Sequence, residues 1–144
     1  MARERLLCTF RVAGLFLGLD IASVQEVLRR QDVTRLPLAA EPVRGIINLR
    51  GRIVPAVDLR RCLGLAPVPD GSERATIVVR GAESPVSLLV DDVGEVVAVS
   101  DESFERPPDT MRPGARELMQ GVFQRNDGLL LELNLGRVLR AAYA

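Results

Sequence analysis

The stretch RGIINLRGRIVPAVDLRRCLGL, residues 44–65, is the part of the sequence that decides the fold. Two apolar and largely β-branched runs, 46–49 and 53–57, flank a polar turn that contains Gly51. Short apolar runs on both sides of a glycine-containing turn predict a β-hairpin. We therefore expect two antiparallel strands here, joined at residues 50–52.

The end of this stretch predicts a short helix after the hairpin. Asp58 stands where a helix N-cap would stand, and Gly64 suits the position just beyond a helix end. Pro55 lies within the second apolar run and has no backbone N–H to donate. We therefore expect that strand to be an edge strand, or to be irregular or bulged at Pro55.

The composition is that of one compact unit with an aliphatic core and no charge excess. The chain has 144 residues, of which 47% are hydrophobic, and 19 acidic residues balance 19 basic ones. With no basic excess, nucleic acid is a poor candidate for the main partner. Four Phe, one Tyr and no Trp leave few platforms for base stacking. A nucleic-acid-binding barrel is the weaker alternative, and oligonucleotide binding at physiological salt would favour it.

The residue types present do not favour an enzyme. His and Lys are both absent, which removes His-based catalysis, Ser-His and Ser-Lys nucleophiles and the usual zinc ligand sets. Cys8 and Cys62 lie among apolar residues and are expected to be buried, reduced thiols. Acidic pairs such as 91–92 and 101–102 are typical of capping or solvated groups. No phosphate-binding loop or dinucleotide fingerprint is present. We expect no catalytic residue, no metal and no cofactor.

The sequence also predicts where the protein resides. No N-terminal signal peptide is visible, and no apolar run approaches the roughly 20 residues that span a bilayer. We therefore expect a cytoplasmic protein.

Short strands dominate the rest of the chain. Gly and Pro interrupt the apolar runs at short intervals, which is typical of a barrel or a sandwich. In the first strand, Leu6, Cys8, Phe10 and Val12 are predicted to face the core, with Thr9 and Arg11 on the other face. The expected strands are 6–12, 15–19, 33–36, 75–80, 86–90, 96–99, 120–124 and 129–132, with a bend at 37–42, a linker at 66–72 and a loop at 105–110.

Two further helices are predicted. The first, residues 21–29, is capped by Asp20, and its apolar positions follow helical spacing. Glu26 falls off that apolar stripe and should be solvated or directed at a partner. The second is capped by Asn134 and presents an apolar face near the C-terminus. The segments 19–27 and 90–96 also echo each other after an apolar strand, which is weak evidence for two similar halves.

Two motifs resemble the CheW-like domain, the adaptor module of bacterial chemotaxis. One is GIINLRG followed by IVPAVDLR, residues 45–51 and 53–60, and the other is LDIASVQEV, residues 19–27. The resemblance runs from 6 to 138, so residues 1–144 are expected to form a single CheW-like domain. It implies a mostly β fold of two intertwined SH3-like five-stranded barrels with short helices. The approximate halves would be 15–68 and 74–134, with terminal segments crossing between them.

The resemblance also implies a function. CheW-like proteins are non-enzymatic adaptors that couple chemoreceptors to a CheA-type histidine kinase and support receptor array assembly. The implied partners are the cytoplasmic tips of methyl-accepting chemoreceptors, held in a groove between the barrels, the regulatory domain of the kinase, and other CheW-like domains. The alternative within the family is an accessory scaffold that binds receptors without engaging the kinase.

Seven residues match family positions connected with receptor or kinase binding. Each has a simpler interpretation: the valines of 24–27 as core residues, Arg50 as a solvated turn residue, and Gly45 as a backbone requirement. In the functional interpretation, apolar side chains receive an amphipathic helix and Arg50 pairs with a partner carboxylate. The candidate residues are Val24, Glu26, Val27, Gly45, Arg50, Val93 and Val96.

Overall fold

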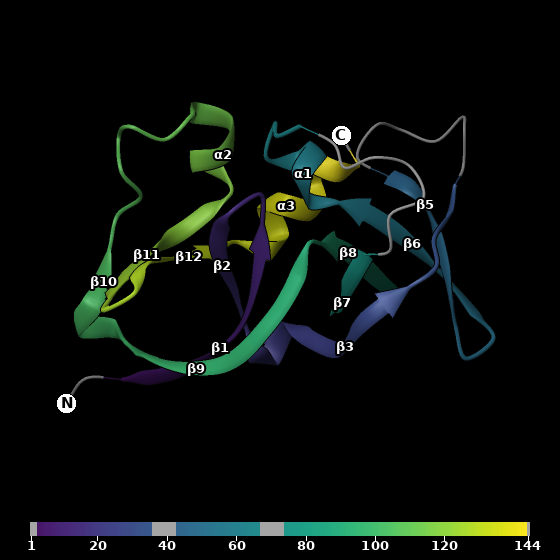
Figure 1. Cartoon of the computed structure of the whole chain (residues 1–144), viewed down its shortest axis with the longest axis horizontal. Coiled ribbons are helices and arrows are strands. Elements are labelled where there is room, and N and C mark those ends of the chain that lie inside the picture. The colour runs from purple at the N-terminus through teal and green to yellow at the C-terminus, as the bar shows by residue number, and fades with distance from the viewer. Residues whose placement is uncertain (1–2, 36–42, 67–73, 144) are drawn as a thin grey trace.

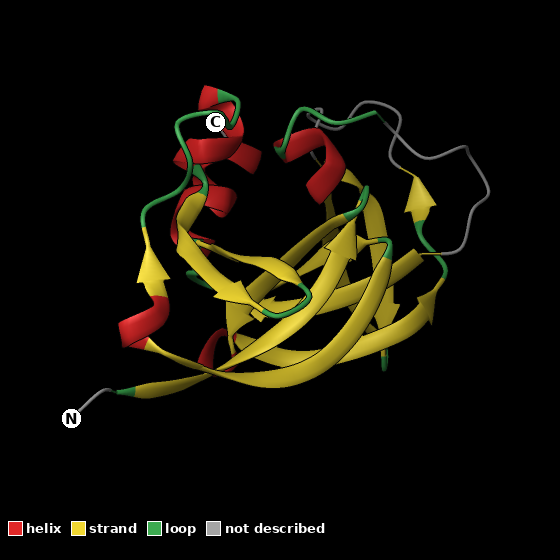
Figure 2. Cartoon of the chain, turned by 60° about the vertical axis from the view of Figure 1, so that its left-hand side comes forward, coloured by secondary structure: helices red, strands yellow, loops and turns green. Residues whose placement is uncertain are grey.

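The computed structural model describes residues 3–35, 43–66 and 74–143, which form two curved, SH3-like β-barrels packed against each other (Figures 1 and 2). Within these residues each sheet has five strands of six to nine residues and one two-residue strand at an edge. The first sheet has the order β10 (Phe104–Glu105), β11 (Met119–Arg125), β12 (Gly128–Leu133), β2 (Leu15–Asp20), β1 (Glu4–Val12) and β9 (Asp92–Ser100). The second has the order β3 (Val24–Gln31), β7 (Arg74–Arg80), β8 (Pro85–Val90), β6 (Arg52–Asp58), β5 (Val43–Leu49) and β4 (Thr34–Arg35).

Short helices connect or cover the strands. The α-helices are α1 (Leu59–Cys62), α2 (Pro113–Glu117) and α3 (Leu135–Ala142), and the 3₁₀ turns are η1 (Ile21–Ser23) and η2 (Asp101–Ser103). The expected mostly β fold of two SH3-like barrels with short helices is confirmed.

The two sheets repeat one pairing scheme. In the first, the antiparallel hairpin β1–β2 pairs in parallel with β12, which belongs to the hairpin β11–β12. In the second, the hairpin β7–β8 pairs in parallel with β6, which belongs to the hairpin β5–β6. The echo between segments 19–27 and 90–96 therefore marks equivalent places in two similar sheets.

The sheets also exchange a strand. β3 follows β2 in the chain but pairs with β7, and β9 follows β8 but pairs with β1. We call the connection from β2 to β3, residues 20–24, the first crossover, and that from β8 to β9, residues 90–93, the second crossover. The sheets consequently divide the chain differently from the expected halves 15–68 and 74–134, because β7 and β8 join β3–β6 and the N-terminal hairpin joins β9–β12.

The largest hydrophobic core is shared by both sheets. It contains Phe10 and Leu17 from the first sheet, Ile77 and Leu88 from the second, and Val138 from α3, all of them at 0% exposure. Each buried side chain of this size contributes roughly 1.5–3 kcal/mol. A smaller cluster lies inside each barrel. Since the main core needs residues from both sheets, the sheets stabilise each other.

The hairpin around residues 50–51 forms as predicted. Arg50 and Gly51 both have positive φ angles, 51° and 84°, which suits a two-residue turn between twisted strands. The Asp58 side chain caps α1 by accepting a hydrogen bond from the Arg60 amide, and Gly64 follows the helix with φ 71°. Both capping predictions are confirmed.

The edge-strand prediction for Pro55 is wrong, because β6 lies between β5 and β8. Pro55 is opposite Ile46 of β5, and the register with β8 begins only at Ala56. The proline thus lies in the part of β6 that precedes its pairing with β8, where a missing N–H costs no registered pair with β8. The irregularity of this hairpin lies on β5 instead, between Val43 and Gly45.

The predicted helix 21–29 is wrong. Asp20 does cap a helical segment, but this is only the three-residue η1, and β3 follows at once. β3 pairs along its length with β7, and this non-local ladder outweighs the local spacing. The helix-like spacing is misleading because it counts Ile21 and Val27 among the buried positions, whereas they are 41% and 39% exposed. Exposure in β3 instead alternates from Val24 to Arg29, as in a strand.

The predicted faces of the first strand are partly wrong. Cys8, Phe10 and Val12 are buried as expected, but Leu6 is 48% exposed and Thr9 is buried. β1 pairs with β2 on one side and β9 on the other, and both of its faces are covered. Cys8, Phe10 and Val12 lie in the main core, and Leu7 lies in the cluster inside the first barrel.

The C-terminal predictions hold better. The hairpin β11–β12 and the helix α3, capped by the Asn134 side chain, are both confirmed. β9 is longer than the expected strand 96–99, and β10 takes the first residue of the expected loop 105–110. The sequence prediction missed α2. The bend 37–42, Leu36 and most of the linker 66–72 lie outside the described residues.

Candidate functional site

Two of the seven candidate residues form an ion pair. Arg50 projects from the β5–β6 turn, and its guanidinium donates a hydrogen bond to the carboxylate of Glu26 on β3. The Arg50 side chain is 70% exposed and that of Glu26 is 25% exposed. The pair therefore joins an edge strand of the second sheet to a hairpin from the other end of that sheet, and it does so at the surface.

The backbone of this turn constrains Arg50. The Asn48 side chain accepts a hydrogen bond from the Gly51 amide at 2.9 Å, which closes the turn. A non-glycine residue at a positive φ costs of order 1–2 kcal/mol. An exposed surface pair contributes only about 0–1 kcal/mol to stability. Stability alone therefore gives little reason for arginine at this strained position.

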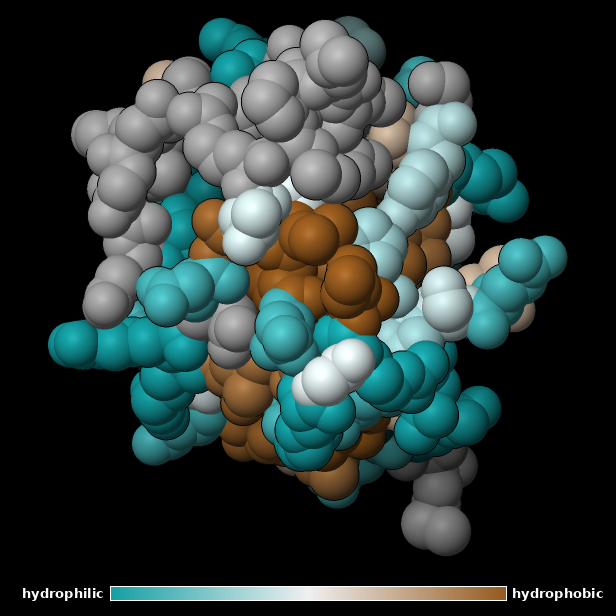
Figure 3. Space-filling model, turned by 90° about the vertical axis from the view of Figure 1, so that its right-hand side faces the viewer, coloured by the Kyte–Doolittle hydropathy of each residue, from teal (hydrophilic) through white to brown (hydrophobic). Residues whose placement is uncertain are grey.

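Apolar side chains on the same elements are exposed as well. Val27 of β3 is 39% exposed and Ile53 of β6 is 69% exposed. Figure 3 shows hydrophobic surface on the side of the molecule where the β5–β6 hairpin lies, bordered by polar side chains. Leu28 and Leu49 on the same strands are half-buried and pack against the cluster inside the second barrel. We call Glu26, Val27, Arg50 and Ile53 the turn surface.

Three other candidates are less accessible. Val24 is half-buried and packs against the main core. Gly45 is buried in β5 opposite Ala56, away from the turn. Val93 is 7% exposed and belongs to the main core. Their structural environment accounts for each of them without a partner.

Val96 is the exposed candidate of the other sheet. It lies on β9 opposite Cys8 and is 50% exposed. Nearby on β1, Leu6 is 48% exposed and pairs with Ala98. β9 also contacts β3, so the two strands that carry the candidate valines meet although they belong to different sheets.

Two exposed residues near the candidates were missed from the sequence. Ile21 was assigned to a buried helical stripe, yet in η1 it is 41% exposed. Ile53 was counted as a strand residue only. The one available indication for Ile53 was its position directly after the polar turn, since an unbroken apolar run does not reveal which face is buried.

A groove lies beside the first crossover. It measures about 860 Å³ and lies between η1, the β7–β8 loop and α3. Ser23 and Arg80 line one side, and Leu135, Leu139 and Tyr143 line the other. Ser23, which lines the groove, directly precedes Val24 in the chain, but none of the seven candidate residues lines the groove.

Comparison with known proteins decides the family. The family model described as "CheW-like domain" matches residues 6–143. This chain belongs to the CheW-like domain family.

Individual relatives of this CheW-like chain are similar over most of their length. "Chemotaxis protein CheW" of Treponema pallidum is 29% identical over 136 residues, which covers 92% of this chain and 80% of the relative. "Chemotaxis protein CheW" of Rhizobium meliloti is 33% identical over 118 residues, with 82% and 76% covered. The crystal structure of the scaffolding protein TtCheW from Thermoanaerobacter tengcongensis superposes with a TM-score of 0.78 at 29% identity, covering 92% of this chain and 90% of that one. The expected family and its role as a chemotaxis adaptor are confirmed.

The second crossover of this CheW-like chain is fixed by a cluster of hydrogen bonds. The Arg60 guanidinium donates to both carboxylate oxygens of Asp91, at 3.0 and 2.6 Å, and the Ala13 amide donates to Asp91 at 2.7 Å. Burial by itself would raise the pKa of Asp91, but the hydrogen bonds from Arg60 and Ala13 outweigh it, and the pKa is lowered. Asp91 is therefore a structural anion that ties α1 and the β1–β2 turn to the crossover.

The thiols of this chain are poorly suited to covalent chemistry. Both cysteines are free. Burial, followed by the charge of Asp58, raises the pKa of Cys62 to about 11, and burial raises that of Cys8. Both thiols are therefore protonated near neutral pH and weakly nucleophilic. In the described part of the chain no group of three or more His, Cys, Asp or Glu side chains is arranged to hold a metal ion.

The helices are short. No helix within the ranges 3–35, 43–66 and 74–143 has both the length and the apolar character needed to cross a bilayer.

Proposed function

We propose that this CheW-like chain is a non-enzymatic adaptor that couples the cytoplasmic tips of methyl-accepting chemoreceptors to the regulatory domain of a CheA-type histidine kinase. In this role it supports receptor array assembly in the cytoplasm and uses no cofactor. The observation that carries the proposal is the turn surface. Two segments that match coupling positions of the family, one containing Glu26 and one containing Arg50, meet there through an ion pair.

The chemistry of the turn surface suits a protein partner. Arginine beside exposed aliphatic side chains is typical of protein interfaces, where a guanidinium reaches a partner carboxylate and the apolar groups lose their contact with water. Arg50 is 70% exposed, so its remaining donors face solvent. Arg50 has a positive φ, and its ion pair adds little to the free energy of unfolding. Both facts fit a residue that is retained for binding.

A second surface supports simultaneous binding of two partners. Val96 and Leu6 are exposed on the first sheet, while the turn surface belongs to the second. The groove beside η1 has apolar side chains from α3 and suits an amphipathic receptor helix. Two separate weak sites on one rigid body raise the effective concentration of each partner for the other.

The proposal is tested by a three-way reconstitution of this protein, a receptor signalling fragment and a cognate CheA-type kinase, with kinase autophosphorylation as the readout. We expect receptor-dependent activation only when this protein is present. Receptor binding with no effect on the kinase would replace the proposal with the accessory scaffold. Binding of neither partner would overturn the proposed function and leave the fold unaffected.

A further inference from the structure

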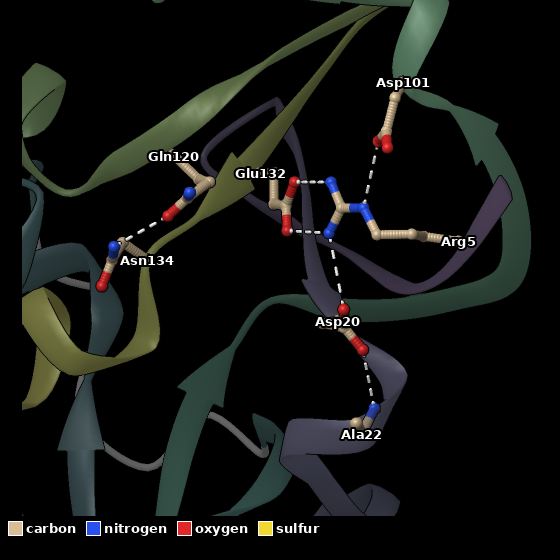
Figure 4. Close-up of polar contacts among 7 residues, drawn as sticks. All are labelled: Arg5, Asp20, Ala22, Asp101, Gln120, Glu132 and Asn134. Carbon is tan, nitrogen blue, oxygen red and sulfur yellow. Dashed lines mark hydrogen bonds and ion pairs between the residues drawn. The ribbon is translucent and has the colours of Figure 1, made fainter. Parts of the chain in front are cut away.

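Arg5, at the start of β1, is the centre of a polar network that contains three carboxylates (Figure 4). Its two terminal nitrogens donate to the two oxygens of Glu132 at 2.8 and 2.6 Å. One of these nitrogens also reaches Asp20 at 3.4 Å, and Nε reaches Asp101 at 3.4 Å. The network thus joins the N-terminal strand to β12, to the end of β2 and to η2.

Glu132 is the fixed point of this network. It lies on β12, an interior strand of the first sheet, and is 4% exposed. Its two oxygens meet the guanidinium in the parallel, two-bond arrangement that is the most geometrically specific pairing available to arginine. The position of the Arg5 head group is therefore set by the interior of the sheet.

Asp20 transmits that position to the first crossover. One of its oxygens accepts from Arg5, and the other accepts from the Ala22 amide at 2.9 Å in the middle of η1. Figure 4 shows Glu132, Arg5, Asp20 and Ala22 in one continuous line of contacts. A buried strand of the first sheet is thereby linked to the segment that begins the exchange into the second.

The link matters for η1 because little packing holds it. None of its three residues is buried. Besides the Asp20 cap, its side-chain contact is a hydrogen bond from Arg80 to the Ala22 carbonyl at 3.2 Å, also exposed. η1 leads directly into Val24 and Glu26, so its placement sets where β3 starts and where Glu26 meets Arg50.

We propose that Arg5 and Glu132 are positioning residues for the coupling surface, acting through Asp20 on η1. The expected effect on partner binding rests on the proposed function. The structural part of the proposal, the placement of η1, stands without a partner.

The test is the double variant Arg5→Gln/Glu132→Gln, with Arg11→Gln as the matched control on the same strand. Removing Arg5 alone would leave Glu132 buried without a cation and would endanger folding. The double change removes both charges while keeping similar shapes. Arg11 is exposed and stacks over Phe16 with no contact to η1, so its variant reports the cost of losing any arginine from β1.

A second variant, Asp20→Asn, tests the same link with less risk to the fold. Asparagine caps a helix about as well as aspartate, so the bond from the Ala22 amide is kept. The attraction to Arg5 is weakened because the charge is gone. The measurements for all variants are amide hydrogen exchange at Ala22, thermal unfolding, and affinity for a receptor signalling fragment and for the kinase regulatory domain.

We expect amide hydrogen exchange at Ala22 to become about fivefold faster in the double variant. This is the factor for loss of one ordinary hydrogen bond, here the bond from Arg5 that holds Asp20. Core amides of β1 and β2 should keep their protection, and affinity for at least one partner should fall about fivefold. Asp20→Asn should change both values in the same direction by a smaller factor, and Arg11→Gln should change neither.

The inference is overturned if Ala22 exchanges as in the control, or if all amides lose protection uniformly, since either result makes the network a general stabiliser. It is also overturned if Ala22 responds while binding stays at the wild-type value. If the wild-type protein binds neither partner, the proposed function fails, and exchange at Ala22 still decides the structural part separately.

Discussion

The two crossovers use the same backbone device in different ways. VQEV, residues 24–27, begins β3, and VGEV, residues 93–96, follows the first residue of β9. Each follows a strand of the opposite sheet, and each contains a register shift soon after pairing begins. An aspartate at the end of the preceding strand or just beyond it contacts an arginine in both cases, Asp20 with Arg5 and Asp91 with Arg60.

The side chains at equivalent positions have different environments. Glu26 pairs with Arg50, whereas no hydrogen bond or ion pair from the described residues reaches the carboxylate of Glu95. The first valine is half-buried in VQEV and 7% exposed in VGEV. The last valine is exposed in both, at 39% and 50%.

This difference shows that the backbone features needed for strand exchange are distinct from the side chains that form a contact surface. A strand exchange needs an anchored turn and a bulge, and both crossovers provide them. A charged contact surface needs in addition a hairpin long enough to bring a cation to the glutamate, and only β5–β6 does so among the strands described here. The charged contact surface therefore belongs to the strand that follows the first crossover, because Glu26 has a cationic partner and the equivalent Glu95 has none among the described residues.

The largest effect on stability is expected from Arg5→Ala. Glu132 would become a buried carboxylate without a cation, which typically costs about 3–5 kcal/mol. Arg60→Ala, the matching change at the second crossover, should cost about 1 kcal/mol, because the Arg60 and Asp91 side chains are 17% and 26% exposed. Urea unfolding of the two variants measures both values. Equal losses would show that the two crossovers are anchored alike.

Gly94→Ala should give the next largest effect. A Cβ at this position would lie 2.6 Å from the Thr9 hydroxyl, which itself donates to the Glu95 carbonyl in the bulge. We expect a loss of about 1–3 kcal/mol by urea unfolding. Gln25→Ala, the equivalent change in VQEV, should stay within about 0.5 kcal/mol because Gln25 is exposed. Adding Thr9→Ala to Gly94→Ala should recover part of the loss, and no recovery would place the strain elsewhere.

A smaller effect is expected from pH at the second crossover. The folded-state pKa of Asp91 is lowered below its ordinary value, so the group stabilises the protein above the unfolded-state pKa of about 3.9 and this contribution is lost as pH falls through the folded value. Arg60→Gln removes the Arg60 hydrogen bonds, which lower the pKa of Asp91 most, and keeps the hydrogen bond from the Ala13 amide. Its thermal midpoint should lie below that of the wild type at pH 7, and the gap should narrow near about pH 3. A gap that is independent of pH would show that Arg60 acts by packing alone.

The sequence predicted local structure well where the determinants lie close together in the chain. The β5–β6 turn, the Asp58 and Asn134 caps and the hairpin β11–β12 each depend on a few neighbouring residues. β3 was missed because its strand character comes from pairing with β7, and because the exposed Ile21 and Val27 complete a helix-like spacing by chance. The exchange of β3 and β9 has no local determinant.

The candidate site was also predicted only where its determinants lie close together in the chain. The resemblance supplied Glu26 and Arg50 as separate candidates, but their pairing follows from the curvature of the second sheet. Val93 is 7% exposed and Val96 is 50% exposed, a difference that the resemblance does not predict. Arg5 was missed because Glu132 lies 127 residues away in the chain.

The most direct test of the account is Arg50→Glu in the three-way reconstitution. The side chain is exposed and its ion pair is a surface one, so the thermal midpoint should change little. The reversed charge would face Glu26 and any partner carboxylate, and receptor-dependent kinase autophosphorylation should be lost or strongly reduced. Full activation by a well-folded Arg50→Glu protein, or a large drop in its thermal midpoint, would contradict the assignment of the turn surface as a coupling surface.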